Sequence, residues 1–220
     1  MENGNNLIDI GGKVVSDFEF SHEIYGEGFY RFDLEVNRLS GAGDILPITV
    51  SERIIDKDRV THGTPVRING QIRSYNNYIP ADKRNKLVLT VFAKDITIEE
   101  LPEKNPNEVF LDGFVCKPAI YRTTPFGREI ADVLMAVNRS YNKSDYIPCI
   151  AWGRNARFGS KLQVGDRIRL WGRMQSRGYQ KKLENGDILD KIAYEVSVSK
   201  LEIVSEDIAA ETPDESTTLE

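Results

Sequence analysis

The chain has 220 residues, of which 40% are hydrophobic and 29% are charged, and its formal net charge is −5 at pH 7. No run of about 18 apolar residues occurs, so a membrane-spanning helix is not expected. The first residues, MENGNNLIDIGG, have no basic region followed by an apolar core, so no secretion signal is expected. The two cysteines, Cys116 and Cys149, do not suggest a disulfide framework. These features are typical of a cytoplasmic globular protein.

The charge is distributed unevenly along the chain. Residues 1–104 hold 13 basic and 17 acidic residues, residues 105–204 hold 16 and 11, and residues 205–220 hold none and 6. The net charges of the three segments are therefore −4, +5 and −6. This distribution indicates that a surface for binding a polyanion would lie in residues 105–204.

Five strands are predicted in each half of the chain. Apolar patterning places the first set near residues 7–20, 28–38, 45–51, 65–75 and 86–98, and the second near residues 108–121, 128–139, 145–153, 166–178 and 191–203. A short irregular or helical link separates the third and fourth strands of each set. Segments 75–85 and 178–190 are predicted to be long hairpin loops, and TPFG at residues 124–127 is typical of a tight turn.

The two sets are copies of one unit, because matched residues keep a nearly constant separation. The anchors are Gly12 with Gly113, Val36-Asn37-Arg38 with Val137-Asn138-Arg139, Pro47 with Pro148, residues 63–68 with 165–170, and residues 70–74 with 172–176. The first three anchors differ by 101 positions and the last two by 102. We therefore predict two tandem domains, residues 1–104 and 105–204, followed by an acidic tail, residues 205–220, that is predicted to be disordered.

Two strands of the second copy combine an apolar face with a face of rings and cations. In the first, Ile147, Cys149 and Ala151 fall on one side, and the other side carries Tyr146, Pro148, Ile150 and Trp152. In the second, the apolar positions are Ile168, Leu170, Gly172 and Met174, and they alternate with Arg167, Arg169, Trp171, Arg173, Gln175 and Arg177. Flat rings between cations suit a polyanion with unstacked bases, which is single-stranded nucleic acid.

Several motifs of the second half resemble those of the bacterial-type single-stranded DNA-binding protein family. They are AVNR at residues 136–139, YIPCIAWGRNA at 146–156, GD at 165–166, GRMQSR at 172–177, YEV at 194–196 and LEI at 201–203. The resemblance covers residues 108–204 well and residues 6–101 weakly. It implies an all-β fold of two tandem OB domains, each a five-stranded Greek-key barrel.

The resemblance also implies a function. It predicts a sequence-nonspecific single-stranded DNA-binding protein of the cytoplasm, associated with the nucleoid, that acts in DNA replication, recombination or repair without a cofactor. Family members commonly assemble four OB domains, so a homodimer is expected. The family usually ends in an acidic-hydrophobic tip that binds replication and repair proteins, and the STTLE end of this chain departs from that tip. RNA stays open as a ligand, because stacking faces do not by themselves read the sugar.

The candidate contacts follow from the face and from the resemblance. Aromatic residues at positions where the family stacks bases are Tyr141, Tyr146, Trp152 and Tyr179, and Trp171 is a further aromatic candidate that the family pattern does not require. Candidate phosphate or hydrogen-bonding contacts are Arg139, Arg154, Arg157, Arg169, Arg173, Gln175, Arg177, Lys181 and Lys182. The alternative for the tryptophans is packing under a loop or in an interface, and for the arginines a solvated surface.

The first copy has lost most of this face. Tyr146, Trp152, Trp171, Arg173 and Tyr179 are matched there by Ile45, Ser51, Asn69, Gln71 and Asn77. A thinner, secondary DNA-binding set remains, formed by Arg38, Arg73, Tyr75 and Tyr78. We expect the second copy to carry most of the affinity for single strands and the first copy mainly to support assembly.

The sequence bears on two other classes of function. Catalysis and a metal site are not expected, because the chain shows no metal-ligand spacing, phosphate-binding loop or nucleophile motif. The stronger alternative is an OB-based protein-interaction or assembly subunit whose aromatic face binds a polypeptide. Salt separates the two, since binding to a polyanion weakens steeply as the salt concentration rises.

Overall fold

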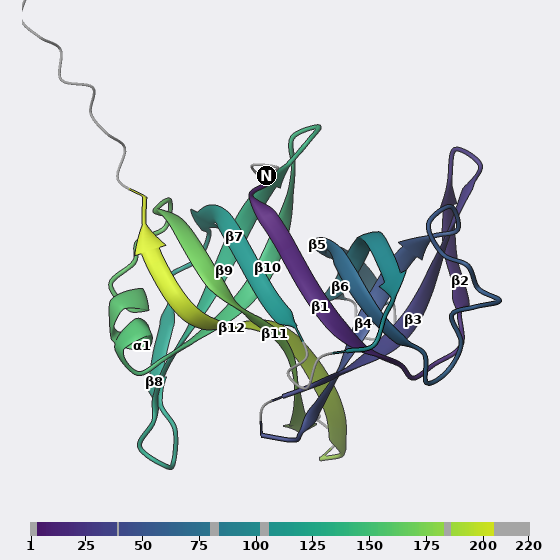
Figure 1. Cartoon of the computed structure of the whole chain (residues 1–220). Coiled ribbons are helices and arrows are strands. Elements are labelled where there is room, and N and C mark those ends of the chain that lie inside the picture. The colour runs from purple at the N-terminus through teal and green to yellow at the C-terminus, as the bar shows by residue number, and fades with distance from the viewer. Residues whose placement is uncertain (1–3, 39, 80–83, 102–105, 183–185, 205–220) are drawn as a thin grey trace, which may run out of the picture.

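The structure is a computed structural model that describes residues 4–38, 40–79, 84–101, 106–182 and 186–204. This part of the chain forms twelve strands and one short helix (Figure 1). They are β1 (Asn6–Val14), β2 (Glu19–Ile24), β3 (Glu27–Asn37), β4 (Gly43–Ser51), β5 (Pro65–Ile79), β6 (Arg84–Ile98), β7 (Asn107–Val115), β8 (Ile120–Thr123), β9 (Glu129–Arg139), β10 (Lys143–Trp152), α1 (Arg154–Gly159), β11 (Arg167–Lys182) and β12 (Ile188–Ile203). The predicted all-β fold is confirmed.

The strands close into two barrels with the same strand order. In barrel 1, defined as β1–β6, β1 pairs with β3 and β5, β3 with β4, and β5 with β6, all antiparallel, and one parallel pair, β4 with β6, closes the ring. Barrel 2, defined as β7–β12, repeats this order with β7, β9, β10, β12 and β11. This is the five-stranded Greek-key order of the OB fold.

The predicted first strand of each copy is interrupted. Residues 7–20 divide into β1 and β2, and residues 108–121 divide into β7 and β8, because the chain leaves the ring and returns to extend the β3 or β9 hairpin. The predicted link after the third strand is the helix α1 in barrel 2 and a series of turns in barrel 1. The predicted domain boundary at residue 104 and the acidic tail, residues 205–220, lie outside the described residues.

Four glycines of the repeat are required where two strands approach closely. A Cβ on Gly12 would lie 2.3 Å from the Glu35 carbonyl oxygen, and one on its equivalent Gly113 would lie 2.5 Å from the Ala136 oxygen. The corresponding distances are 2.2 Å for Gly70 and 2.3 Å for Gly172, each beside a bulge in the ladder to the last strand. The motifs that reveal the repeat therefore mark the points where each barrel bends tightly.

The barrels are joined through their first strands. β1 and β7 lie side by side in the middle of the molecule and pair antiparallel, with Ile8 opposite Val109 at the centre (Figure 1). These two residues are equivalent positions of the repeat, 101 residues apart. The outer pairs exchange equivalent positions, because Asn6 pairs with Leu111 and Asn107, the equivalent of Asn6, pairs with Ile10, the equivalent of Leu111. The barrels are therefore related by an approximate two-fold axis through this pair, and their sheets form one continuous twelve-stranded sheet.

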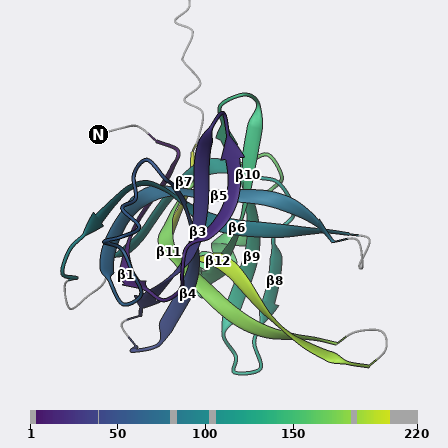
Figure 2. The ribbon, with the colours of Figure 1, turned by 90° about the vertical axis from the view of Figure 1, so that its right-hand side faces the viewer.

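The predicted long hairpin loops are instead extended strands, and this prediction was wrong. β5 and β6 remain paired as far as Ile79 and Arg84, and β11 and β12 as far as Lys182 and Ile188. Figure 2 shows both two-stranded ribbons extending beyond the barrels on the same side. These residues have no barrel interior to face, so the apolar alternation that identifies a strand is absent from them.

Candidate nucleic-acid interface

Strand β10 presents the aromatic row that its alternation predicts. Ile147, Cys149 and Ala151 are buried in barrel 2, whereas 43% of Tyr146 and 38% of Trp152 are exposed on the outer side. Ile150, which lies between them, differs from the prediction because only 2% of it is exposed. Since a strand rises about 3.3 Å per residue, the two rings are about 20 Å apart along it. The row can therefore contact several nucleotides of an extended strand.

Tyr141 lies at the turn between β9 and β10 in a conformation unusual for its residue type. Its φ is 62° and that of Asn142 is 54°, both in the left-handed region that bulky residues rarely adopt. The ring is 93% exposed and so gains almost no packing in return. A strained backbone that presents an open ring next to the β10 row is consistent with a binding role.

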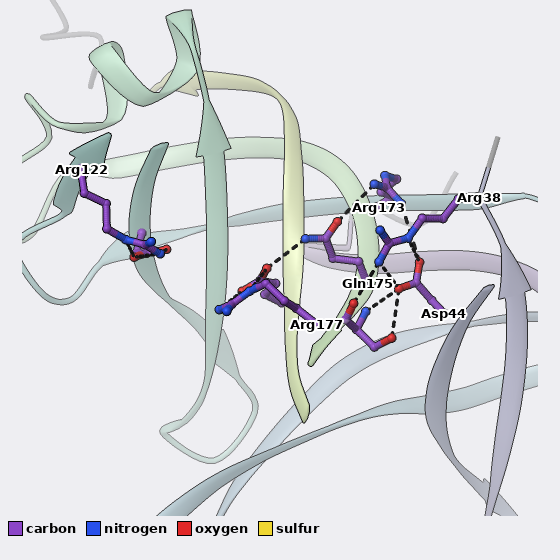
Figure 3. A network of polar contacts seen from close by, with 9 residues as sticks. Arg38, Asp44, Arg122, Arg173, Gln175 and Arg177 are labelled. Atoms are coloured by element: carbon purple, nitrogen blue, oxygen red, sulfur yellow. Dashed lines mark hydrogen bonds and ion pairs between the residues drawn. The ribbon is translucent and has the colours of Figure 1, made fainter. Parts of the chain in front are cut away.

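The outer side of the β11–β12 ribbon carries a connected polar network. The Arg177 guanidinium donates to the Glu195 carboxylate at 3.2 Å and lies 6.0 Å from the centre of the Tyr179 ring, which is 40% exposed. Gln175 is buried, and its amide donates to Glu195 at 2.9 Å and accepts from Arg173 at 3.2 Å. Figure 3 shows Arg173, Gln175 and Arg177 in a row. Gln175 therefore supports the network from its buried side, whereas we predicted an outward-facing contact with nucleic acid.

A groove opens where β12 leaves β10. The two strands pair only at Cys149 with Val196 and at Ile150 with Ser197, and beyond these positions they separate. The opening has a volume of about 510 Å³, and we call it the ribbon groove. Its lining from barrel 2 includes Lys117, Ile120, Leu134, Pro148, Arg177, Tyr179, Ile192, Tyr194 and Glu195. The groove therefore places two of the predicted contacts, Arg177 and Tyr179, beside apolar and basic residues.

Two predicted phosphate contacts, Arg38 and Arg173, meet a buried carboxylate at the junction of the barrels. Asp44 of β4 is fully buried and accepts two hydrogen bonds from Arg38, at 2.7 and 2.6 Å. It also accepts from the Ser176 backbone N–H of barrel 2 at 2.7 Å, and Arg173 lies 3.7 Å away. Burial by itself would raise the pKa of Asp44, but the hydrogen bonds from Arg38 and Ser176 outweigh burial and hold the pKa below its usual value.

A second buried carboxylate occupies the equivalent position of barrel 2. Asp145 accepts from Arg73 at 2.9 Å and from the Ser74 backbone N–H at 2.8 Å, both from barrel 1, and from Arg139 at 3.3 Å. The Ser74 hydroxyl in turn accepts from the backbone N–H of Tyr146 at 2.7 Å. Barrel 1 therefore fixes the backbone of β10 at Tyr146, the first residue of the aromatic row. The four arginines Arg38, Arg73, Arg139 and Arg173 therefore take part in the junction between the barrels. Their role as DNA contacts stays a prediction.

Trp171 and Arg169 lie on the outer face of the sheet that joins the barrels. The Trp171 ring packs against Phe110 with ring centres 5.2 Å apart and lies under the Lys200 ammonium at 4.4 Å. Arg169 pairs with Asp112 at 3.1 Å. Burial opposes ionisation of Asp112, yet the hydrogen bonds from Arg167 and Arg169 hold its pKa below the usual value. Trp171 is thus more enclosed by neighbours than Trp152.

The other candidates are spread over the surface. Arg154 is exposed on α1, and Arg157 pairs with Glu129 at 2.8 Å near the end of β10. In barrel 1, the Tyr75 hydroxyl accepts from Arg31 at 2.8 Å, and 58% of Tyr78 is exposed. The candidates whose side chains lie outside the described part of the structure are Lys181 and Lys182, at the end of β11.

Comparisons with known proteins follow the division between the barrels. A model of the single-strand binding protein family matches residues 106–208. Single-stranded DNA-binding protein B of Bacillus subtilis (strain 168) is 33% identical over 81 residues, which are 34% of this chain and 72% of that protein. The chain belongs to the single-strand binding protein family. Single-stranded DNA-binding protein 1 of Staphylococcus aureus (strain COL) is 36% identical over 81 residues, 34% of this chain, and this chain spans 48% of its length.

The likeness in fold extends over both barrels. A deletion and point mutant of the single-stranded DNA binding protein from Thermus aquaticus matches with a TM-score of 0.75 and 20% identity, over 96% of this chain and 100% of that one. The wild-type protein matches with a TM-score of 0.72 and 18% identity, over 91% and 93%. The predicted arrangement of two OB barrels in tandem is thus confirmed for this member of the single-strand binding protein family.

Three residues were not identified as candidates from the sequence: Lys117 and Tyr194, which line the ribbon groove, and Arg122, which pairs with the groove residue Asp132 at 2.9 Å (Figure 3). Loop and edge residues of this kind have no periodic signal. The junction carboxylates did have a signal in the sequence, because Asp44 and Asp145 are 101 positions apart, which is the separation of the repeat.

No helix among the described residues is long and apolar enough to cross a membrane. No group of three or more His, Cys, Asp or Glu side chains among them is arranged to hold a metal ion.

Proposed function

We propose that this member of the single-strand binding protein family is a sequence-nonspecific single-stranded DNA-binding protein that acts in DNA replication, recombination or repair. The observation that carries the proposal is the exposed row of Tyr146 and Trp152 on β10, beside a groove with basic residues. We place this activity in the cytoplasm, at the nucleoid. The two barrels act as domains, residues 1–104 and 105–204, and the second supplies most of the affinity.

Binding combines stacking with phosphate contact. Bases stack on Tyr146, Trp152 and Tyr179, with Tyr141 at the turn, and each ring contributes about 1–3 kcal/mol. The phosphates then lie near exposed cations of barrel 2, chiefly Arg154 and Arg177, with Arg157 and Arg169 as further candidates. Lys181 and Lys182 stay candidates from the sequence. Neither type of contact reads the base edges, so the proposed binding has little sequence preference and falls with salt.

Barrel 1 supplies a weaker surface in this proposal. At the positions of Tyr146 and Trp152 it has Ile45, which is 36% exposed, and Ser51, which is buried. Tyr75 and Tyr78 form the secondary site, with Arg38 and Arg73 as its cations. We therefore assign barrel 1 mainly to assembly.

A homodimer with four barrels is part of the proposal. Two barrels per chain support it, given that the family commonly assembles four. The outer face of the β1–β7 junction offers an apolar centre in Phe110 and Trp171, surrounded by ion pairs such as Asp9–Arg67 at 2.6 Å. Light scattering would give the mass of the chain in solution. Twice the mass of 24.9 kDa supports the dimer, and a monomer at micromolar concentration overturns it.

Tryptophan fluorescence during titration with oligo(dT), at low and at high salt, tests the function. Wild-type protein is expected to show strong quenching that salt reverses. Trp152→Ala should lose most of the quenching and much of the affinity, whereas Tyr25→Ala, which removes an exposed ring from the β2–β3 turn, should keep both.

The outcomes separate the two classes of function. Absence of binding at low salt would exclude the single-strand proposal and favour a polypeptide ligand for the same face, and a contact of that kind would resist salt. Titration with oligo(U) in parallel measures the preference between DNA and RNA, which the stacking rings alone do not set.

A further inference from the structure

The ribbon groove of barrel 2 has a wall that belongs to barrel 1. Four consecutive residues of β6, Lys86 to Leu89, line it opposite β9, β10 and β12. They reach the groove because the β5–β6 ribbon extends past its own barrel, and because the junction at Asp145 fixes β5 against β10. The groove is thus a composite of segments from the two barrels that are at least 28 residues apart in the chain, from Leu89 to Lys117.

The groove has the size and lining of a site for one nucleotide. Its volume of about 510 Å³ lies within the range of roughly 300–1,000 Å³ that is typical of small-ligand pockets. Apolar surface comes from Leu87, Leu134, Pro148 and Ile192, and the Tyr179 and Tyr194 rings also line it. A base that is unstacked from its neighbours requires this kind of apolar and aromatic surface.

The charges of the groove suit a phosphate. The two lining carboxylates are already paired, Asp132 with Arg122 at 2.9 Å and Glu195 with Arg177 at 3.2 Å. Among the described residues, Lys86 and Lys117 have no carboxylate partner, and both ammonium groups belong to exposed residues. An anion that enters the groove therefore meets two uncompensated positive charges from two different barrels.

The equivalent position of barrel 1 has the opposite character. Leu134, Ile120 and Lys117 are matched there by Asp33, Glu19 and Ser16. Asp33 has no ion-pair partner among the described residues, and burial, followed by the nearby Glu19 carboxylate, raises its pKa. Burial, followed by the same Asp33 carboxylate, also raises the pKa of Tyr194, which lines the ribbon groove, so Asp33 acts at the edge of that groove as well. A phosphate would be repelled at the equivalent position of barrel 1, so the two-fold relation of the barrels does not extend to the groove.

We infer that the ribbon groove is a nucleotide subsite of the single-strand path, in which barrel 1 contributes Lys86 to a phosphate and Leu87 and Val88 to the base. This inference rests on the proposed function, since it continues the path from Tyr146 past Tyr179 into the groove. It assigns to barrel 1 a direct contact with the strand that barrel 2 binds. The two barrels then work as one binding unit, and the β5–β6 ribbon is part of the site.

A pair of equivalent lysines tests the inference. Lys86→Gln removes the cation in the groove, and Lys191→Gln removes its counterpart on the β11–β12 ribbon, which is not among the groove residues. Oligo(dT) affinity would be measured for the full-length protein at several salt concentrations. Lys86→Gln is expected to weaken binding about threefold or more and to lower the slope of log K against log salt by about 1. Lys191→Gln should change the affinity less than twofold.

Photo-cross-linking gives a second readout that does not depend on a substitution. Oligo(dT) that contains 4-thiothymidine would be irradiated in complex with wild-type protein, and the linked peptides identified by mass spectrometry. Links to residues 86–89 together with links to barrel 2 support the composite subsite.

The outcomes distinguish the subsite from the proposed function. If the wild-type protein binds and Trp152→Ala does not, while Lys86→Gln is unchanged and residues 86–89 are never linked, the subsite is refuted and the function stands. If the wild-type protein fails to bind at low salt, both fall together.

Discussion

The two barrels are alike where they touch each other and different where they face outward. Asn6 and Asn107, Asp44 and Asp145, and Ser74 and Ser176 are equivalent pairs, and both members of each pair hold the junction or a neighbouring strand. The outer faces of the two barrels have few side chains in common at equivalent positions. The comparison shows that the junction requires the same chemistry from both copies, whereas the proposed binding requires an open aromatic face from only one.

The outer face of barrel 1 is closed by its own side chains. Phe29 stacks under His22 with ring centres 4.9 Å apart and planes 7° from parallel, and Phe92 packs against it at 5.8 Å. The Thr49 and Thr90 hydroxyls hydrogen-bond at 2.8 Å. Rings that pack on one another leave less surface for a base than Tyr146 and Trp152 do. Barrel 1 therefore has aromatic residues without an open aromatic row.

The largest effect is expected at the junction, and it should be equal on the two sides. Asp44→Asn or Asp145→Asn leaves arginines facing a neutral, buried amide, and breaking a buried charge pair in this way costs about 3 kcal/mol. Urea denaturation would measure the loss of unfolding free energy. Asp58→Asn, at an exposed aspartate, is the control. A loss for one carboxylate and none for the other would break the symmetry that we describe.

The next effect contrasts one position in the two barrels. Tyr146→Ala removes a ring of the open row, and a loss of about 1–3 kcal/mol per stacked base predicts roughly 5- to 150-fold weaker binding of oligo(dT). Ile45→Ala, at the equivalent position of barrel 1, should weaken it less than twofold. Equal losses would show that the strand contacts both faces alike.

A smaller effect follows from moving a residue of one barrel into the other. Asp33→Leu gives barrel 1 the residue that barrel 2 has at Leu134, and it removes a carboxylate that repels phosphate. Oligo(dT) affinity should rise a few-fold at low salt, and the gain should vanish at high salt because the effect is electrostatic. Leu134→Asp is the reciprocal variant and should weaken binding. An unchanged affinity in both variants would show that this pair of positions is not on the path.

The smallest effect is a dependence of stability on pH. The pKa values of Asp44 and Asp112 are below the usual value of 3.8, so ionisation of these groups stabilises the folded state above that pH. The stabilisation should be lost as the pH falls through the lowered pKa values. The melting temperature should therefore decrease when the pH is lowered below about 4. Melting curves of wild-type protein and Asp44→Asn would show it. If the melting temperature of Asp44→Asn falls as much on acidification as that of the wild-type protein, Asp44 is excluded as a source of the pH dependence.

The fold was predictable because barrels have a strong signal. Inward residues such as Ile147, Cys149 and Ala151 alternate with outward ones, and the repeat reproduces the signal in both copies. The ribbons were missed because their residues have no interior to face. The roles of Arg139 and Arg173 were missed for another reason. An exposed arginine on a nucleic-acid-binding face and an arginine paired with a carboxylate look the same in sequence, and only the fold brings Asp145 beside Arg139 and Asp44 beside Arg173.

The pairing of β1 with β7 has a consequence for how such a chain can change. Because both strands belong to one polypeptide, each barrel meets its partner at an effective concentration of the order of millimolar or more. Dilution cannot separate them, and the ratio of the two is always one to one. In a dimer of separate, identical one-barrel subunits, every substitution would appear in the outer faces of both barrels at once. Here a substitution alters one face alone, so a closed barrel and an open barrel can be inherited together as a permanent pair.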